Sequence, residues 1–203
     1  TLTKAVAAAA ANTGTTAAIN DAIAGLKAAE KTAQGAVADQ ITAGTQAIKD
    51  IPANIKDDKG VQDKSAALNT LLTNGTATAD DITKAINDLT SAEATAKQAL
   101  ADERTNATNA QTAATKDTTV DAIYTASKQA VTDGTATDAQ KALVKAYDKV
   151  TDLLADANDA TTTKTDLTSA EASLQSAVDA YNDERAKVIE TGNNLESASK
   201  ADT

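Results

Sequence analysis

The stretch ITKAINDLTSAEATAKQAL, residues 82–100, decides the fold, because its apolar residues recur at intervals of three and four. The ladder runs through Ile82, Ile86, Leu89, Ala96 and Leu100. This spacing places these residues on one face of an α-helix with 3.6 residues per turn. Beyond residue 100 the same ladder continues on alanine and charged residues, which predicts weaker packing of that half.

Three further ladders obey the same spacing, and strand-like alternation is not apparent anywhere. They are Ile19, Ile23, Leu26, Ala33, Val37, Ile41 and Ile48; Ala139, Leu143, Ala146, Val150, Leu153 and Ala157; and Leu167, Ala170, Leu174, Val178, Tyr181 and Val188. The sequence therefore predicts an all-α fold without a β-sheet. The predicted helices are 15–49, 61–73, 79–114, 118–132, 137–157 and 164–190, with a further short helix at 3–11.

Capping and turn residues set the predicted boundaries. Asn74-Gly75 and Asp133-Gly134 are turn dipeptides, and the only proline, Pro52, lies in a connection. The predicted N-caps are Thr78 or Asp80, Thr137 or Asp138, and Thr165 or Asp166. Three glycines, Gly25, Gly35 and Gly44, each cost about 1 kcal/mol relative to alanine in a helix. The segment 15–49 is thus either one helix with close contacts at its glycines or a helix broken there.

Short blocks of sequence recur along the chain. Residues 74–78 recur at 133–137, residues 89–93 at 167–171, and Asp-Glu-Arg at 102–104 and 183–185. The offsets differ, which indicates two related units with an extra helix and loop in the second. We expect an N-terminal segment at 1–14 followed by two elongated antiparallel three-helix bundles in tandem, at 15–115 and 117–203. Two such bundles end to end would form a rod of about 80–100 Å.

The composition limits the core and the chemistry. Among 203 residues there are 49 alanines and 33 threonines but no Phe, Trp, Met, His or Cys. Thin cores between closely spaced helices can be built from this set, because alanine lets backbones approach and favours helix. Without His or Cys, imidazole-assisted nucleophiles and soft-metal sites are excluded. A carboxylate-only glycosidase would need a deep pocket, so we expect no enzyme, no cofactor and no metal.

Charge excludes further partners. The net charge is -10 and the only arginines are Arg104 and Arg185, so nucleic-acid binding is not expected. No apolar run is long enough to span a membrane, and no signal peptide or initiator Met is present. We therefore read Thr1 as a cut end.

Two segments resemble a known family. Residues 146–161 resemble the helix end and loop of FIVAR-type modules, and residues 165–178 resemble their last helix. The family's Tyr-Thr-x-x-Ser-Trp start is echoed by Tyr124 to Ser127, with Lys128 in place of the Trp. FIVAR-type modules are three-helix bundles repeated in surface adhesins of Gram-positive bacteria, some attaching to matrix or glycan and others serving as stalk. The resemblance implies an extracellular, cell-surface or cell-wall location.

Candidate site residues are few. The only aromatic residues, Tyr124, Tyr147 and Tyr181, either converge on a ligand-binding patch or fill the core with their hydroxyls at the surface. Asp57-Asp58 and Asp80-Asp81 could bind a hard cation or serve as helix caps, and capping is the simpler interpretation. Asp156, Asn158 and Asp159 lack the glycine and closing glutamate of a calcium loop. The Asp-Glu-Arg blocks fit surface ion pairs.

Two functions follow from these observations. The first is an adhesin module or stalk segment, expected to be monomeric. The second is a helical module that binds a glycan or a host extracellular-matrix protein near the tyrosines. An ice-binding helix would need threonines at strict eleven-residue spacing, and the run Thr161 to Thr163 breaks that spacing.

Overall fold

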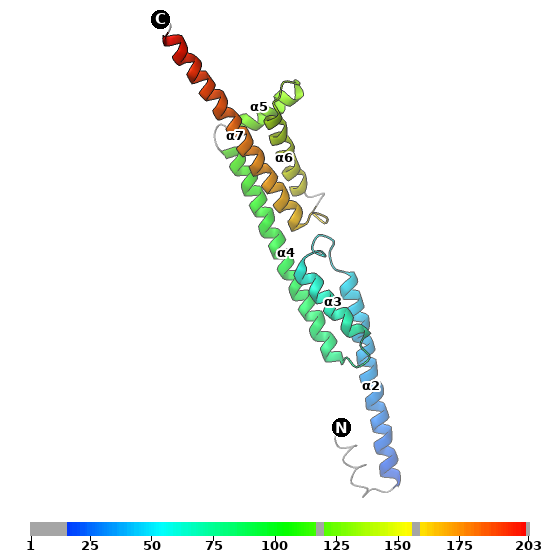
Figure 1. Cartoon of the computed structure of the whole chain (residues 1–203). Coiled ribbons are helices and arrows are strands. Elements are labelled where there is room, and N and C mark those ends of the chain that lie inside the picture. The colour runs from blue at the N-terminus through cyan, green and yellow to red at the C-terminus, as the bar shows by residue number, and fades with distance from the viewer. Residues whose placement is uncertain (1–15, 117–119, 156–158, 202–203) are drawn as a thin grey trace. The chain divides into compact units, whose positions relative to one another are not determined.

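The computed structural model describes residues 16–116, 120–155 and 159–201, and this part of the chain is helical without a strand. The helices, in chain order, are α2 (Thr16–Lys49), α3 (Lys59–Thr73), α4 (Ala79–Lys116), α5 (Val120–Thr132), α6 (Asp138–Leu154) and α7 (Lys164–Ala201) (Figure 1). The prediction of an all-α fold is confirmed. The predicted short helix at 3–11 and the whole N-terminal segment 1–14 lie outside the described residues.

Helix boundaries agree with the sequence to within two residues except at the ends of α6 and α7. The three internal glycines do not break α2, which is one helix of 34 residues. The helix predicted at 137–157 ends at Leu154 instead, three residues early. The helix predicted at 164–190 continues to Ala201, past Gly192. The helix predicted to begin at 61 begins at Lys59, since Asp58 caps it.

The helices α4, α6 and α7 each begin with a pair of reciprocal capping hydrogen bonds. Thr78 and Asp81 exchange hydrogen bonds, in which the Asp81 carboxylate accepts from the Thr78 amide and the Asp81 amide donates to the Thr78 hydroxyl. Thr137 forms the same capping box with Gln140. At α7 the cap is Thr163, which bonds reciprocally with Asp166. The predicted cap at Thr165 or Asp166 was therefore wrong by two or three residues, because Asp166 serves as the third residue of the box.

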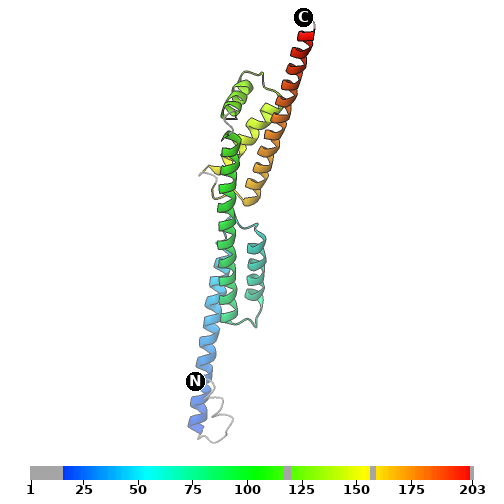
Figure 2. The same cartoon turned by 90° about the vertical axis from the view of Figure 1, so that its left-hand side faces the viewer.

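The chain divides into two compact units, and the first unit contains residues 1–51 and 56–94. Its core is built by α3 together with parts of α2 and α4, and Figure 2 shows α3 beside the first part of α4. Val61, Leu68, Ile82 and Leu89 are at most 1% exposed. Ile82 and Leu89 lie on a ladder predicted from the sequence, so the apolar spacing correctly locates the α4 side of this core.

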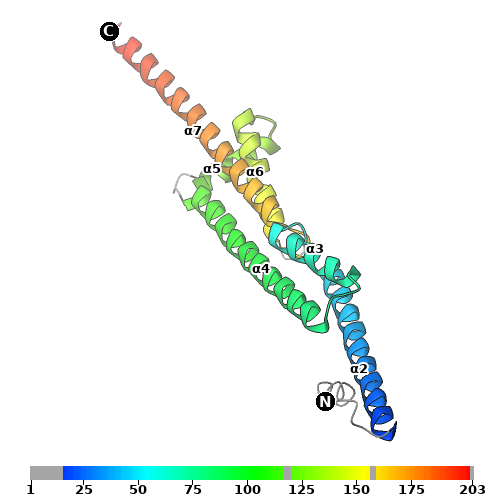
Figure 3. The same cartoon turned by 60° about the horizontal axis from the view of Figure 1, so that its bottom comes forward.

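The second unit contains residues 52–55 and 95–203. Here α6 contacts both α5 and α7 (Figure 3). Leu143, Val150, Leu167 and Leu174 are at most 2% exposed. Alanines complete the core: Ala107 of α4 has no exposed surface. Small residues at such positions let helices approach closely, which suits a chain that is poor in large apolar residues.

The division between the units falls inside α4, between Ala94 and Thr95. Residues 79–94 of this helix therefore belong to the first unit and residues 95–116 to the second. The tandem three-helix bundles predicted at 15–115 and 117–203 stay a prediction. None of the helices in the described residues is long and apolar enough to cross a membrane.

Candidate functional site

Two of the three candidate tyrosines meet between α5 and α6. The ring centroids of Tyr124 and Tyr147 are 4.0 Å apart, with 31° between the ring planes. Both side chains are half-buried. Offset aromatic pairs of this kind stabilise a contact beyond the area they bury. The pair therefore joins two helices and also presents part of its surface to solvent.

Two charged side chains surround this pair. The Tyr124 hydroxyl donates a hydrogen bond of 2.5 Å to Oδ1 of Asp148. Lys128 Nζ donates to the same hydroxyl at 3.0 Å and lies 3.7 Å from Oδ1 of Asp148. The Lys128 ammonium is also 5.3 Å from the Tyr124 ring centroid. We call Tyr124, Lys128, Tyr147 and Asp148 the tyrosine cluster.

The electrostatics of the tyrosine cluster keep its groups in their ordinary charge states. Burial, followed by the hydrogen bond to Asp148, raises the pKa of Tyr124 above its usual 10.0. The hydrogen bond to Tyr124 and the charge of Asp148 raise the pKa of Lys128 above 10.5. At neutral pH the phenol is thus a hydrogen-bond donor and the lysine a cation. Such a cluster can bind polar or aromatic surface.

The third candidate tyrosine lies in a different place. Tyr181 lines a small surface groove of about 210 Å³ between the start of α6 and the later part of α7. Its neighbours along this groove include Glu184, whose carboxylate accepts a hydrogen bond of 3.1 Å from the Thr137 hydroxyl. The structure therefore brings Tyr124 and Tyr147 together and gives Tyr181 separate surroundings.

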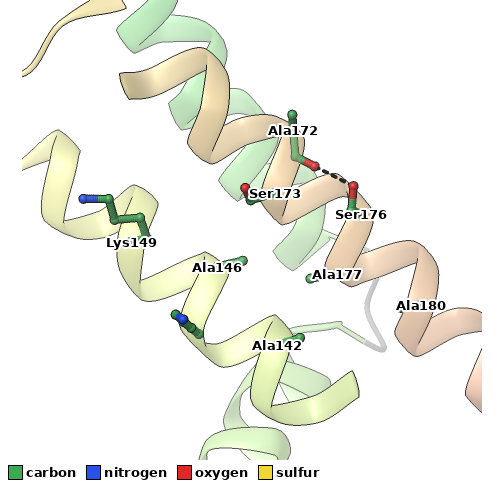
Figure 4. A pocket seen from close by; sticks show the side chains of 9 residues that line it. Ala142, Ala146, Lys149, Ala172, Ser173, Ser176, Ala177 and Ala180 are labelled. Atoms are coloured by element: carbon green, nitrogen blue, oxygen red, sulfur yellow. Dashed lines mark hydrogen bonds between the residues drawn. The ribbon is translucent and has the colours of Figure 1, made fainter. Parts of the chain in front are cut away.

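A larger groove of about 630 Å³ runs between α6 and α7. Figure 4 shows the small side chains that line it, and the Ser176 hydroxyl donates to the Ala172 carbonyl of its own helix at 2.9 Å. Lys145 and Lys149 lie at its α6 side. The rest of the lining consists of alanine and serine: Ala142, Ala146, Ala172, Ser173, Ser176, Ala177 and Ala180. The groove offers methyl groups and two ammonium groups.

The paired aspartates are located at helix starts. Asp58 caps α3 by accepting from the amides of Gly60 and Val61 at 2.8 and 3.2 Å. Asp81 belongs to the cap of α4, and its hydrogen bonds with Thr78 lower its pKa below 3.8. In the described ranges no three acidic groups come together as a metal site. Asp156 and Asn158 lie outside the described residues.

The two Asp-Glu-Arg blocks have different surroundings. In the first block Glu103 is only 9% exposed and accepts a hydrogen bond from Thr168 of α7. Nη2 of Arg104 lies 2.6 Å from Oδ1 of Asp159. This block therefore joins α4 to α7 and to the loop before it. In the second block, Arg185 is exposed on α7.

A second glutamate lies near Glu103. Burial, and then the charge of Glu103, raises the pKa of Glu171 above 4.5. Its Oε1 atom is buried without a hydrogen-bond partner. Burial and the charge of Glu103 both disfavour the ionised form of Glu171, which makes stability depend on pH.

Sequence reasoning missed three of these residues. Lys128 and Asp148 complete the tyrosine cluster, and Glu103 is buried rather than at the surface. The signal for Lys128 was present, because residues four apart lie on one face of a helix and Tyr124 precedes it by four. The signal for Glu103 was its position on the ladder of residues 82–100, which continues at 103 and 107.

The comparisons with protein families, with curated proteins and with solved structures find no match to this chain. The resemblance to FIVAR-type modules therefore stays a prediction.

Proposed function

We propose that this chain is a stalk or spacer segment of a bacterial extracellular protein, located at the cell surface or cell wall and related to FIVAR-type modules. The observation that carries the proposal is the division of α4 between two compact units. The chain thus passes from one core to the next within a single helix. Repeated bundles joined in this way suit a segment whose role is to separate its two ends.

The surface chemistry supports the same role. The groove between α6 and α7 is lined by alanine, serine and lysine side chains. The net charge of -10 favours the solubility of such a surface. A spacer needs these properties and needs no reacting group.

A surface-display experiment tests the spacer role. An epitope is anchored to a Gram-positive bacterial cell beyond zero, one or two copies of the full chain, and antibody binding is measured. We expect epitope accessibility to rise with each copy. A Leu68→Asp variant serves as control, because it places a charge in the core of the first unit and should lose part of the gain. Equal accessibility with zero and two copies would contradict the proposal.

The tyrosine cluster favours a second candidate function. Two stacked, half-buried rings beside a lysine and an aspartate combine flat apolar surface with hydrogen-bonding groups. Glycans and host extracellular-matrix proteins are bound by surfaces of this composition. The alternative is therefore a ligand-binding module whose site is the tyrosine cluster.

Binding of the folded chain to arrayed glycans and matrix proteins separates the two candidates. If the alternative holds, Lys128→Gln should weaken a specific signal, because it removes the charge at the rim and keeps the helix. Tyr181→Ala is the matched control, since Tyr181 lines a different groove. A signal that responds equally to both variants would exclude the tyrosine cluster as the site.

A further inference from the structure

Two helix ends expose apolar side chains that their own units do not cover. In the first part of α2, Ile23 and Leu26 are 45% and 41% exposed. In the last part of α7, Val188 and Leu195 are 66% and 67% exposed. Within its unit, α2 extends beyond α3, and α7 extends beyond α6 (Figures 1 and 2). Both ladders predicted from the sequence thus continue past the helices that would bury them.

The three long helices are related in sequence. Residues 29–42 of α2, AEKTAQGAVADQIT, match residues 92–105 of α4, AEATAKQALADERT, at more than half of the positions. The Asp-Glu-Arg blocks align α4 with α7 at 102–104 and 183–185. These alignments make Gly44, Ala107 and Val188 equivalent positions.

The three equivalent positions differ in burial. Gly44 is buried, because Leu68 and Leu72 of α3 lie against it. Ala107 is completely buried in the second unit. Val188, the largest of the three, is the one that stays exposed. The last part of α7 therefore resembles in sequence a helix that begins a bundle, and its apolar residues are exposed.

The first part of α2 has the complementary character. Ala18-Ile19-Asn20-Asp21 repeats Ala85-Ile86-Asn87-Asp88, which lies in the part of α4 that completes the first unit. In that unit the later part of α2 and the first part of α4 belong to the same core. The end of α7 corresponds to the later part of α2, and the start of α2 corresponds to the first part of α4.

We propose that the exposed end of α7, residues 186–197, packs against the first part of α2 of a second copy of this chain, head to tail. The contact would bring together counterparts of the later part of α2 and the first part of α4, the two parts that share the core of the first unit. One copy contributes the end of α7 and the other contributes the start of α2. Each copy therefore keeps one free surface, so the association is open-ended and extends an array. This inference deepens the proposed spacer function and rests on it.

A two-copy polypeptide, with the full chain joined directly to a second full chain, tests the contact. Joining the copies raises their effective concentration to the millimolar range, so even a weak contact forms. Hydrogen exchange is followed by mass spectrometry on peptides that cover residues 186–197 and 19–41. We expect two equal populations for each peptide, one protected and one exchanging as in the single chain, because only the inner ends are covered.

Two substitutions at the inner α7 sharpen the test. Val188→Asp should abolish the protected population, because Val188 is equivalent to the buried Ala107. Ile189→Asp is the matched control, since its equivalent, Thr108, is exposed. It should leave the protected population in place. A single population exchanging at the single-chain rate, or equal effects of the two substitutions, would overturn the proposal. Ligand binding on the arrays would contradict the spacer function and leave this result unchanged.

Discussion

Gly44 of α2 lies so close to Leu72 of α3 that a Cβ atom on the glycine would be 2.8 Å from Cδ2 of the leucine. The other internal glycines of α2 have no such neighbour: a Cβ atom added to Gly25 or Gly35 would meet nothing within 4 Å. One glycine therefore permits a close helix contact, and the other two only weaken the helix.

This difference predicts opposite effects of the same kind of substitution. Gly35→Leu should increase the helicity of α2 and stabilise it by up to about 1 kcal/mol, because leucine has a higher helix propensity than glycine and meets open space there. Gly44→Leu should destabilise the first unit by about 1–3 kcal/mol through overpacking against Leu68 and Leu72. Circular dichroism and urea unfolding measure both effects. Equal stability changes at the two positions would show that α3 does not press on Gly44.

The cap of α7 gives a second prediction. Thr163→Ala removes the hydroxyl that accepts from the Asp166 amide, so it should cost about 1 kcal/mol of unfolding free energy. Thr165→Ala, the position favoured by the sequence alone, should change stability by less than about 0.5 kcal/mol. Urea unfolding of the two variants compares them. A larger loss from Thr165→Ala would move the cap to the sequence-based position.

In the tyrosine cluster, removal of the Tyr124 hydroxyl group is expected to lower the stability of the fold. Tyr124→Phe keeps the ring contact with Tyr147 but removes the hydrogen bond to Asp148, which should cost about 1–2 kcal/mol. Tyr181→Phe is the matched substitution outside the tyrosine cluster and should cost less. Thermal unfolding at neutral pH ranks the two variants. The reverse order would mean that the hydroxyl of Tyr124 contributes little to the contact of α5 with α6.

The raised pKa of Glu171 predicts how the free energy of unfolding changes with pH. Its folded pKa lies above 4.5, so the folded chain binds its proton more tightly than the unfolded chain. The stability that this group contributes is complete below pH 4.5 and is lost as pH rises through the folded pKa. Glu171→Gln should therefore be more stable than the parent at about pH 7, with a smaller difference at about pH 4. Glu190→Gln, at an exposed position of α7, is the control. A parent that is more stable than Glu171→Gln at neutral pH would contradict this assignment.

Part of this fold could be predicted from local sequence. The helical ladders locate Ile82, Leu89, Leu143 and Leu174 in the cores, since periodicity records which face is buried. The site was predicted less completely, because the contact of Tyr124 with Tyr147 depends on how α5 and α6 pack. Periodicity also cannot tell which stretch of a ladder has a partner. The exposed Val188 lies on a ladder as regular as those of the core.

The division of α4 between two units is tested most directly by hydrogen exchange along this helix after the first unit is weakened. Leu68→Ala removes a fully buried side chain of α3 and should cost that unit about 2–5 kcal/mol. We expect residues 79–94 of α4 to lose protection while residues 95–112 keep that of the parent, because the two parts belong to different cores. Loss of protection along the whole of α4 would contradict a helix shared between two units and would place the boundary at its end, near residue 116.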